Sequence, residues 1–106
     1  MSLQKIPQYP EIEFPEGFDE RAQDEMVVKG WLGPIKVKFE DGNQYSVFFI
    51  DPARLGQDLS YDTKRGIPCF AEQGLIVIPK MTMEHIEASV EYLWKDGFFT
   101  HLKPVD

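Results

Sequence analysis

The sequence predicts an α+β domain, with a largely antiparallel sheet of about five strands and one main amphipathic helix, residues 82–96, packed on one face. Three observations predict this class. β-branched and aromatic residues alternate with polar ones between residues 26 and 50, an apolar run fills residues 74–79, and a helical apolar stripe follows it. The chain of 106 residues has the length of one domain, and 42% of its residues are hydrophobic, as in ordinary globular proteins.

Residues 1–25 differ from the rest of the chain. They hold seven acidic and two basic residues, a net charge of −5, whereas the other 81 residues carry −2. Pro7, Pro10 and Pro15 disfavour a helix there. Four apolar residues are spaced through the same stretch: Tyr9, Ile12, Phe14 and Phe18. We therefore divide the chain into an acidic, proline-bearing N-terminal arm and a single α+β domain, residues 26–106. We expect the arm to lie across this chain's own core; docking on a partner and disorder are the alternatives.

The first strands of the domain are expected at residues 26–32 and 35–40, joined by a turn at Gly33–Pro34. A hairpin then leads into residues 44–50. A three-residue loop, residues 41–43, would pair Phe39 with Tyr45 and Val37 with Val47, which keeps the apolar side chains on one face.

The strand at residues 44–50 is expected to be central in the sheet. Phe48 and Ile50 are apolar on the face opposite to Tyr45, Val47 and Phe49. A strand that is apolar on both faces is usually covered on both faces.

A short helix is expected at residues 52–59, with Asp51 as its N-cap and Pro52 in its first position. Gly56 should keep it short. A polar loop follows, and residues 67–70 could form an edge strand beginning near Pro68. The apolar run at residues 74–79 is typical of a strand buried on both faces.

The main helix is expected to begin after Thr82 as N-cap and to end at Gly97. Its apolar stripe has helical spacing and consists of Met83, Ile86, Val90, Leu93 and Trp94. Residues 98–105 are expected to form the last strand.

The sequence predicts no catalytic residues, no metal site and no cofactor. One cysteine and two histidines cannot form an internal disulfide or a zinc site of the usual kind. Cys69 lies among apolar neighbours in the sequence, which predicts a buried, structural thiol with a disfavoured thiolate rather than a nucleophile paired with His85. Four carboxylates lie in loops beside the presumed sheet, but an acid-rich chain produces such groupings by chance; they are Asp51, Asp58, Asp62 and Glu72.

Four residues are candidates for binding. Trp31 ends a predicted strand, where an exposed tryptophan would be an interaction hot spot, although burial under the arm is the simpler interpretation. Lys64 and Arg65 form the only adjacent basic pair and could hold an anionic group, or simply be solvated. His85 lies on the flank of the predicted helix, where a packing role is the simpler interpretation.

The net charge of −7 opposes binding to nucleic acid, and no apolar run reaches the ~18 residues of a membrane span. A single cysteine fits a reducing compartment, so we expect a cytoplasmic protein. We expect a non-catalytic protein-interaction or binding module that contacts a protein partner, or a second copy of itself, through the N-terminal arm. One version is an acidic inhibitor or immunity-type protein. The alternative is a small enzyme or ligand-binding domain with a site formed across an oligomer interface from residues 51–66.

Overall fold

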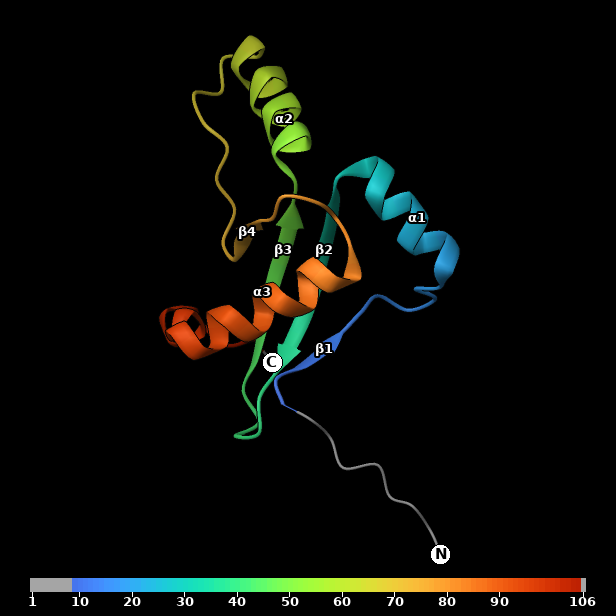
Figure 1. The fold of residues 1–106 in the computed structure, drawn as a ribbon. Coiled ribbons are helices and arrows are strands. Elements are labelled where there is room, and N and C mark those ends of the chain that lie inside the picture. The colour runs from blue at the N-terminus through green and yellow to red at the C-terminus, as the bar shows by residue number, and fades with distance from the viewer. Residues whose placement is uncertain (1–8, 106) are drawn as a thin grey trace, which may run out of the picture.

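The computed structural model describes residues 9–105 and shows an α+β fold with a four-stranded mixed sheet (Figure 1). The strands, which lie in the sheet in chain order, are β1 (Glu11–Glu13), β2 (Trp31–Lys38), β3 (Gln44–Ile50) and β4 (Leu75–Val77). The helices are α1 (Glu20–Lys29), α2 (Pro52–Lys64), α3 (Met83–Asp96) and a 3-10 helix, η1 (Phe98–His101). The pairs β1–β2 and β2–β3 are antiparallel, and β3–β4 is parallel. The expectation of about five antiparallel strands is therefore only partly met.

The core lies between one face of the sheet and α3, which crosses that face (Figure 1). Ile35, Val37, Val47 and Phe49 point into this core and are almost fully buried. We call the opposite face the open face. Its residues alternate along the strands with the buried ones, and most of them are half-exposed or exposed. The open face consists of Glu11, Glu13, Trp31, Pro34, Lys36, Lys38, Gln44, Ser46, Phe48, Ile50, Leu75 and Val77. The sheet thus has one covered face and one open face.

The β2–β3 hairpin differs from the predicted register by two residues. Val37 pairs with Tyr45, and the loop is closed by Phe39, whose N–H donates to the Asn43 carbonyl at 2.9 Å. Gly42, with φ 89°, takes the left-handed position of the loop. A shift of two residues preserves which side chains share a face, so the predicted inward set was correct although its pairs were wrong.

Residues 26–29 belong to α1, so the strand predicted there is wrong. Asp19 caps the helix by accepting a hydrogen bond from Ala22 N–H at 2.9 Å, and Gly30 ends it with φ 75°. These two caps prevail over the strand preference of Val27 and Val28, which are both exposed. Gly33–Pro34 is likewise no turn, because it lies inside β2 at an irregularity of the ladder.

The remaining differences lie in the second half of the chain. α2 runs to Lys64, because its exposed Gly56 does not end it. Residues 67–70 form no strand, and the predicted last strand is η1 followed by a single bridge from Val105 to Gln44. β4 is not buried on both faces, because Val77 is 50% exposed. The starts of α2 and α3, the end of α3 at Gly97 and the central place of β3 are confirmed.

The described part of the N-terminal arm lies on this chain's own core. Ile12 of β1 pairs with Val37 of β2, and Ile12, Phe14 and Phe18 pack against the core cluster. The rings of Phe14 and Phe18 are stacked at 4.9 Å. Residues 1–8 of the arm lie outside the described residues, and the division into an arm and a domain stays a prediction.

We expect Gly30→Ala to destabilise the protein more than Gly42→Ala. Both glycines have positive φ, 75° and 89°, so each alanine costs about 1 kcal/mol of backbone strain. A Cβ at position 30 would also lie 2.8 Å from the Asp51 carboxylate and from Arg54 Cβ, whereas a Cβ at position 42 meets nothing within 4 Å. Overpacking of this kind adds about 1–3 kcal/mol. Urea unfolding measures both losses, and equal values would contradict the prediction.

Candidate binding surfaces

A groove of about 710 Å³ runs between β1 and α3. We call it the acidic groove. Its lining residues are Tyr9, Pro10, Glu11, Ile12, Phe14, Glu87, Val90, Glu91 and Trp94. Ile12 and Phe14 come from the arm, and Val90 and Trp94 come from α3. Every charged residue of the lining is a glutamate, which gives the groove apolar and aromatic walls with negative charge at its rim.

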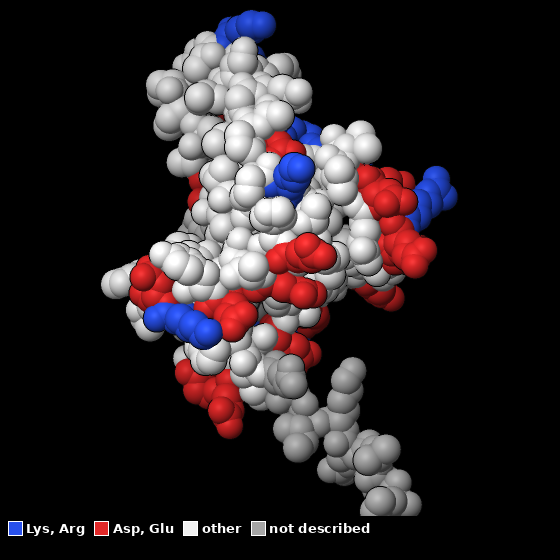
Figure 2. Space-filling view, viewed as in Figure 1, with Lys and Arg blue, Asp and Glu red and all other residues white. Residues whose placement is uncertain are grey.

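The glutamates of the groove are only lightly compensated. Glu91 Oε1 accepts a hydrogen bond from Lys95 Nζ at 3.0 Å, but both side chains are well exposed, and such pairs contribute little. In residues 9–105, neither Glu11 nor Glu87 forms an ion pair, although Glu11 lies close enough to Lys38 for its charge to help raise the Lys38 pKa. Figure 2 shows acidic side chains gathered over α3 and α1 on this side of the molecule, with few basic ones among them. This side therefore attracts cations.

One ion pair joins β1 to β2 on the open face. The Lys38 ammonium donates to the Glu13 carboxylate, and this contact lowers the pKa of Glu13 and raises the pKa of Lys38. A lowered carboxyl pKa gives stability that is present above the unfolded pKa and is lost as the pH falls through the folded one. Because both groups are exposed to water, the pair serves to align β1 rather than to perform chemistry.

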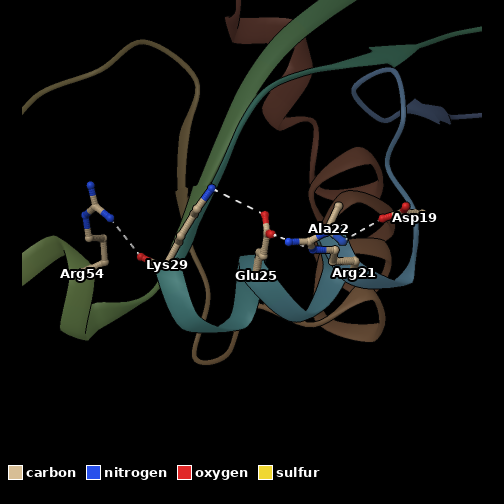
Figure 3. Close-up of polar contacts among 6 residues, drawn as sticks. All are labelled: Asp19, Arg21, Ala22, Glu25, Lys29 and Arg54. Atoms are coloured by element: carbon tan, nitrogen blue, oxygen red, sulfur yellow. Dashed lines mark hydrogen bonds and ion pairs between the residues drawn. The ribbon is translucent and has the colours of Figure 1, made fainter.

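Trp31 lines a smaller cavity of about 160 Å³ at the end of the open face near α2. Phe48, Phe49, Ile50, Arg54, Asp58, Phe70, Glu72 and Leu75 complete this lining. The Arg54 guanidinium lies 5.8 Å from the centre of the Trp31 ring. Its Nε donates to Asp58 Oδ1 at 2.9 Å. Its Nη1 donates to the Lys29 carbonyl at 3.1 Å (Figure 3). Arg54 thus joins α1, α2 and β2, and these contacts use its donors for structure.

The other sequence candidates lie elsewhere. Lys64 ends α2 and Arg65 follows it, both exposed, with the Arg65 guanidinium 5.2 Å over the Tyr61 ring. His85 lies in the first turn of α3. Its ring Nδ1 is 2.7 Å from the Thr82 hydroxyl, and its backbone N–H donates to the same oxygen at 3.2 Å. His85 is therefore part of the helix cap. None of the four candidates lines the acidic groove.

Cys69 is exposed, so the predicted burial is wrong. Residues 67–70 form no strand, and Ile67 beside it is also exposed, so apolar neighbours in the sequence did not become apolar neighbours in space. Across residues 9–105, no group of three or more His, Cys, Asp or Glu side chains is placed to hold a metal ion.

Sequence reasoning missed the acidic groove. Its two walls are far apart in the chain, and spacing gives no information about which arm residue meets which helix residue. The available signals were the apolar residues of the arm and Trp94 at the edge of the helical stripe.

Comparison with protein family models, curated proteins and solved structures found no match to this chain. No helix in the described part of the chain combines the length and apolar character needed to cross a bilayer.

We expect the folded protein to react with a thiol reagent at nearly the rate of the unfolded chain, because Cys69 is exposed. We also expect Cys69→Ser to change the free energy of unfolding by less than about 0.5 kcal/mol, as is usual for surface substitutions. Ellman's reagent at neutral pH, with and without denaturant, measures the first expectation. A reaction that is about 100-fold slower in the folded protein would contradict the exposure of the thiol.

Proposed function

We propose that this protein is a non-catalytic interaction module that binds a basic polypeptide segment in the acidic groove between β1 and α3. One observation carries the proposal: the groove has an apolar, aromatic lining in which all the charged residues are glutamates. Its lining offers no serine, histidine or cysteine, so it supplies contacts and no nucleophile other than carboxylates and the Tyr9 phenol.

The aromatic residues of the groove provide the anchors that such binding needs. Trp94 is 44% exposed and Tyr9 is 39% exposed, and these two residue types are common hot spots in interfaces. A lysine or arginine side chain placed over Trp94 would gain a cation–π contact, while its charge would be close to Glu87 or Glu91. The apolar part of the same segment would cover Ile12 and Phe14.

The charge of the whole chain supports the same class of partner. A net charge of −7 raises the local concentration of cationic partners and speeds their association. The attraction should fall as salt rises, since exposed charges are screened beyond about 10 Å at 0.1 M. An acidic inhibitor or immunity-type protein that faces a basic target is one version of this function.

The second candidate is a ligand-binding domain or small enzyme whose site is completed across an oligomer interface. The Trp31 cavity favours it, because Asp58 and Glu72 meet aromatic side chains there at the base of α2. The cavity of about 160 Å³ is smaller than the ~300–1,000 Å³ of typical ligand pockets, so a second chain would have to complete it.

We expect a fluorescent peptide of alternating lysine and leucine to bind the protein, and Trp94→Ala to weaken that binding by about tenfold or more, the loss of a hot-spot residue. The control is Tyr92→Ala, which removes an exposed aromatic residue from the same helix outside the groove. Fluorescence anisotropy measures both affinities, and circular dichroism verifies the fold. An equal loss in the two variants would overturn the assignment of the groove.

We expect Glu87→Gln to weaken the same peptide and to reduce the salt dependence of its binding, because a groove carboxylate is lost. Glu40→Gln, which makes the same change in the exposed hairpin loop, should have a smaller effect. A peptide with glutamate in place of lysine should not bind. If it binds as tightly as the lysine peptide, the electrostatic part of the proposal is wrong.

A further inference from the structure

We propose that two copies of this chain associate through the open face of the sheet, on the side opposite to the acidic groove. The open face has two halves. The apolar half contains Trp31, Pro34, Phe48, Ile50, Leu75 and Val77, and the charged half contains Glu11, Glu13, Lys36 and Lys38 together with Gln44 and Ser46. We infer that the apolar half is the contact. This inference does not depend on the proposed function of the groove.

The first reason is that β3 is apolar on both faces but covered on one. Phe49 and Val47 belong to the buried core, whereas Phe48 on the open face is only half-buried. Ile50 is 3% exposed yet lies outside the core cluster. A central strand of this composition is normally covered on both faces. In a single chain the second cover is only partial, because Phe70 and Glu72 border Phe48 and Leu75 while Val77 stays 50% exposed.

α2 could cover the open face but does not lie on it. α2 begins at the end of β3 and projects beyond the sheet instead of lying on it (Figure 1). None of its 13 residues is buried. The apolar half of the open face therefore keeps an exposed edge, where Val77 is 50% exposed.

The local charge balance of the open face allows a second copy to be its occupant. A chain with a net charge of −7 repels its own copies, and α1 and α3 carry many of its acids on the covered side (Figure 2). On the open face, Glu11 and Glu13 are balanced by Lys36 and Lys38, one pair of which is in contact. Next to the apolar half, Arg54 and Asp58 also neutralise each other. Two copies meet here without the like-charge repulsion that the other side would cause.

The arrangement of the two halves restricts the symmetry of the pair. A two-fold axis parallel to the strands places the apolar half of one sheet on the apolar half of the other. A two-fold axis across the strands, through the middle of the sheet, would instead set the charged half of each copy on the apolar half of the other, which would bury charge against apolar side chains. The parallel axis is therefore the one that we propose.

The size of the face predicts a weak dimer. The apolar half spans three strands, β2, β3 and β4, which lie about 4.8 Å apart and contribute about four residues each, so it measures about 14 by 13 Å, or about 190 Å² in projection. A standard stable interface uses about 800 Å² on each partner. We therefore expect a dissociation constant in the micromolar range or above, and a dimer that depends on concentration.

Sedimentation equilibrium from about 5 µM to 500 µM, a range that brackets the expected constant, tests the proposal. We expect the wild-type protein to shift from monomer to dimer, and Val77→Lys to raise the dissociation constant by at least tenfold. The control is Val28→Lys, which makes the same change at a residue that is 88% exposed on α1, and it should dimerise like the wild type. Far-ultraviolet circular dichroism confirms that both variants are folded.

Val77→Thr provides a second variant of nearly unchanged size and strand preference if Val77→Lys does not fold, and it should raise the dissociation constant a few-fold. A wild-type protein that stays monomeric up to 500 µM would overturn the proposal and leave the open face to a different protein. The proposal would also be overturned if both position-77 variants have the same dissociation constant as Val28→Lys.

Discussion

The fold depends on the close approach of Gly30 and Asp51, where two helices and two strands meet. Asp51 N–H donates to the Gly30 carbonyl at 2.8 Å, which extends the β2–β3 ladder beyond Trp31 and Ile50. The Asp51 carboxylate accepts from Arg54 N–H at 2.8 Å and starts α2. Gly30 itself ends α1 in the left-handed conformation. A side chain at position 30 would occupy the space of that carboxylate, so all four elements require glycine there.

This junction also decides which faces of the sheet are covered. α2 leaves β3 at Asp51 and projects from the sheet (Figure 1). Arg54 holds its first turn in place through contacts with the Trp31 ring and with the Lys29 carbonyl, the second of which Figure 3 shows. The cover of the sheet then comes from α3 on one face. The exposed residues of β3 and β4 on the other face follow from how α2 is placed. The acidic groove depends instead on how β1 lies beside α3.

Sequence reasoning succeeded where the signal is local and failed where the contact is distant. α3 begins after Thr82 and ends at Gly97 as predicted, because caps act within a few residues of the helix ends. The inward set of the hairpin was also predictable, because strand parity survives a shift of two residues. The strand preference of Val27 and Val28 led to the wrong prediction of a strand where α1 lies, because two helix caps stabilise the helix more than that preference opposes it. The partners of Ile12 in the groove, more than 70 residues away in α3, follow from tertiary packing alone.

The two proposed contacts, although on opposite sides of the sheet, are connected through charge. A basic segment in the acidic groove would neutralise part of the net charge of −7, which opposes the approach of a second copy. If both contacts form, partner binding strengthens self-association, and self-association strengthens partner binding by the same factor, because coupling between binding equilibria is reciprocal. The distance between the faces keeps this coupling small at physiological salt, where the screening length is about 8 Å. A large coupling that persists at high salt would have to be transmitted by packing instead of by charge. β1 is the element placed to transmit it, because Ile12 faces the groove while Glu13 is paired with Lys38 on the open face.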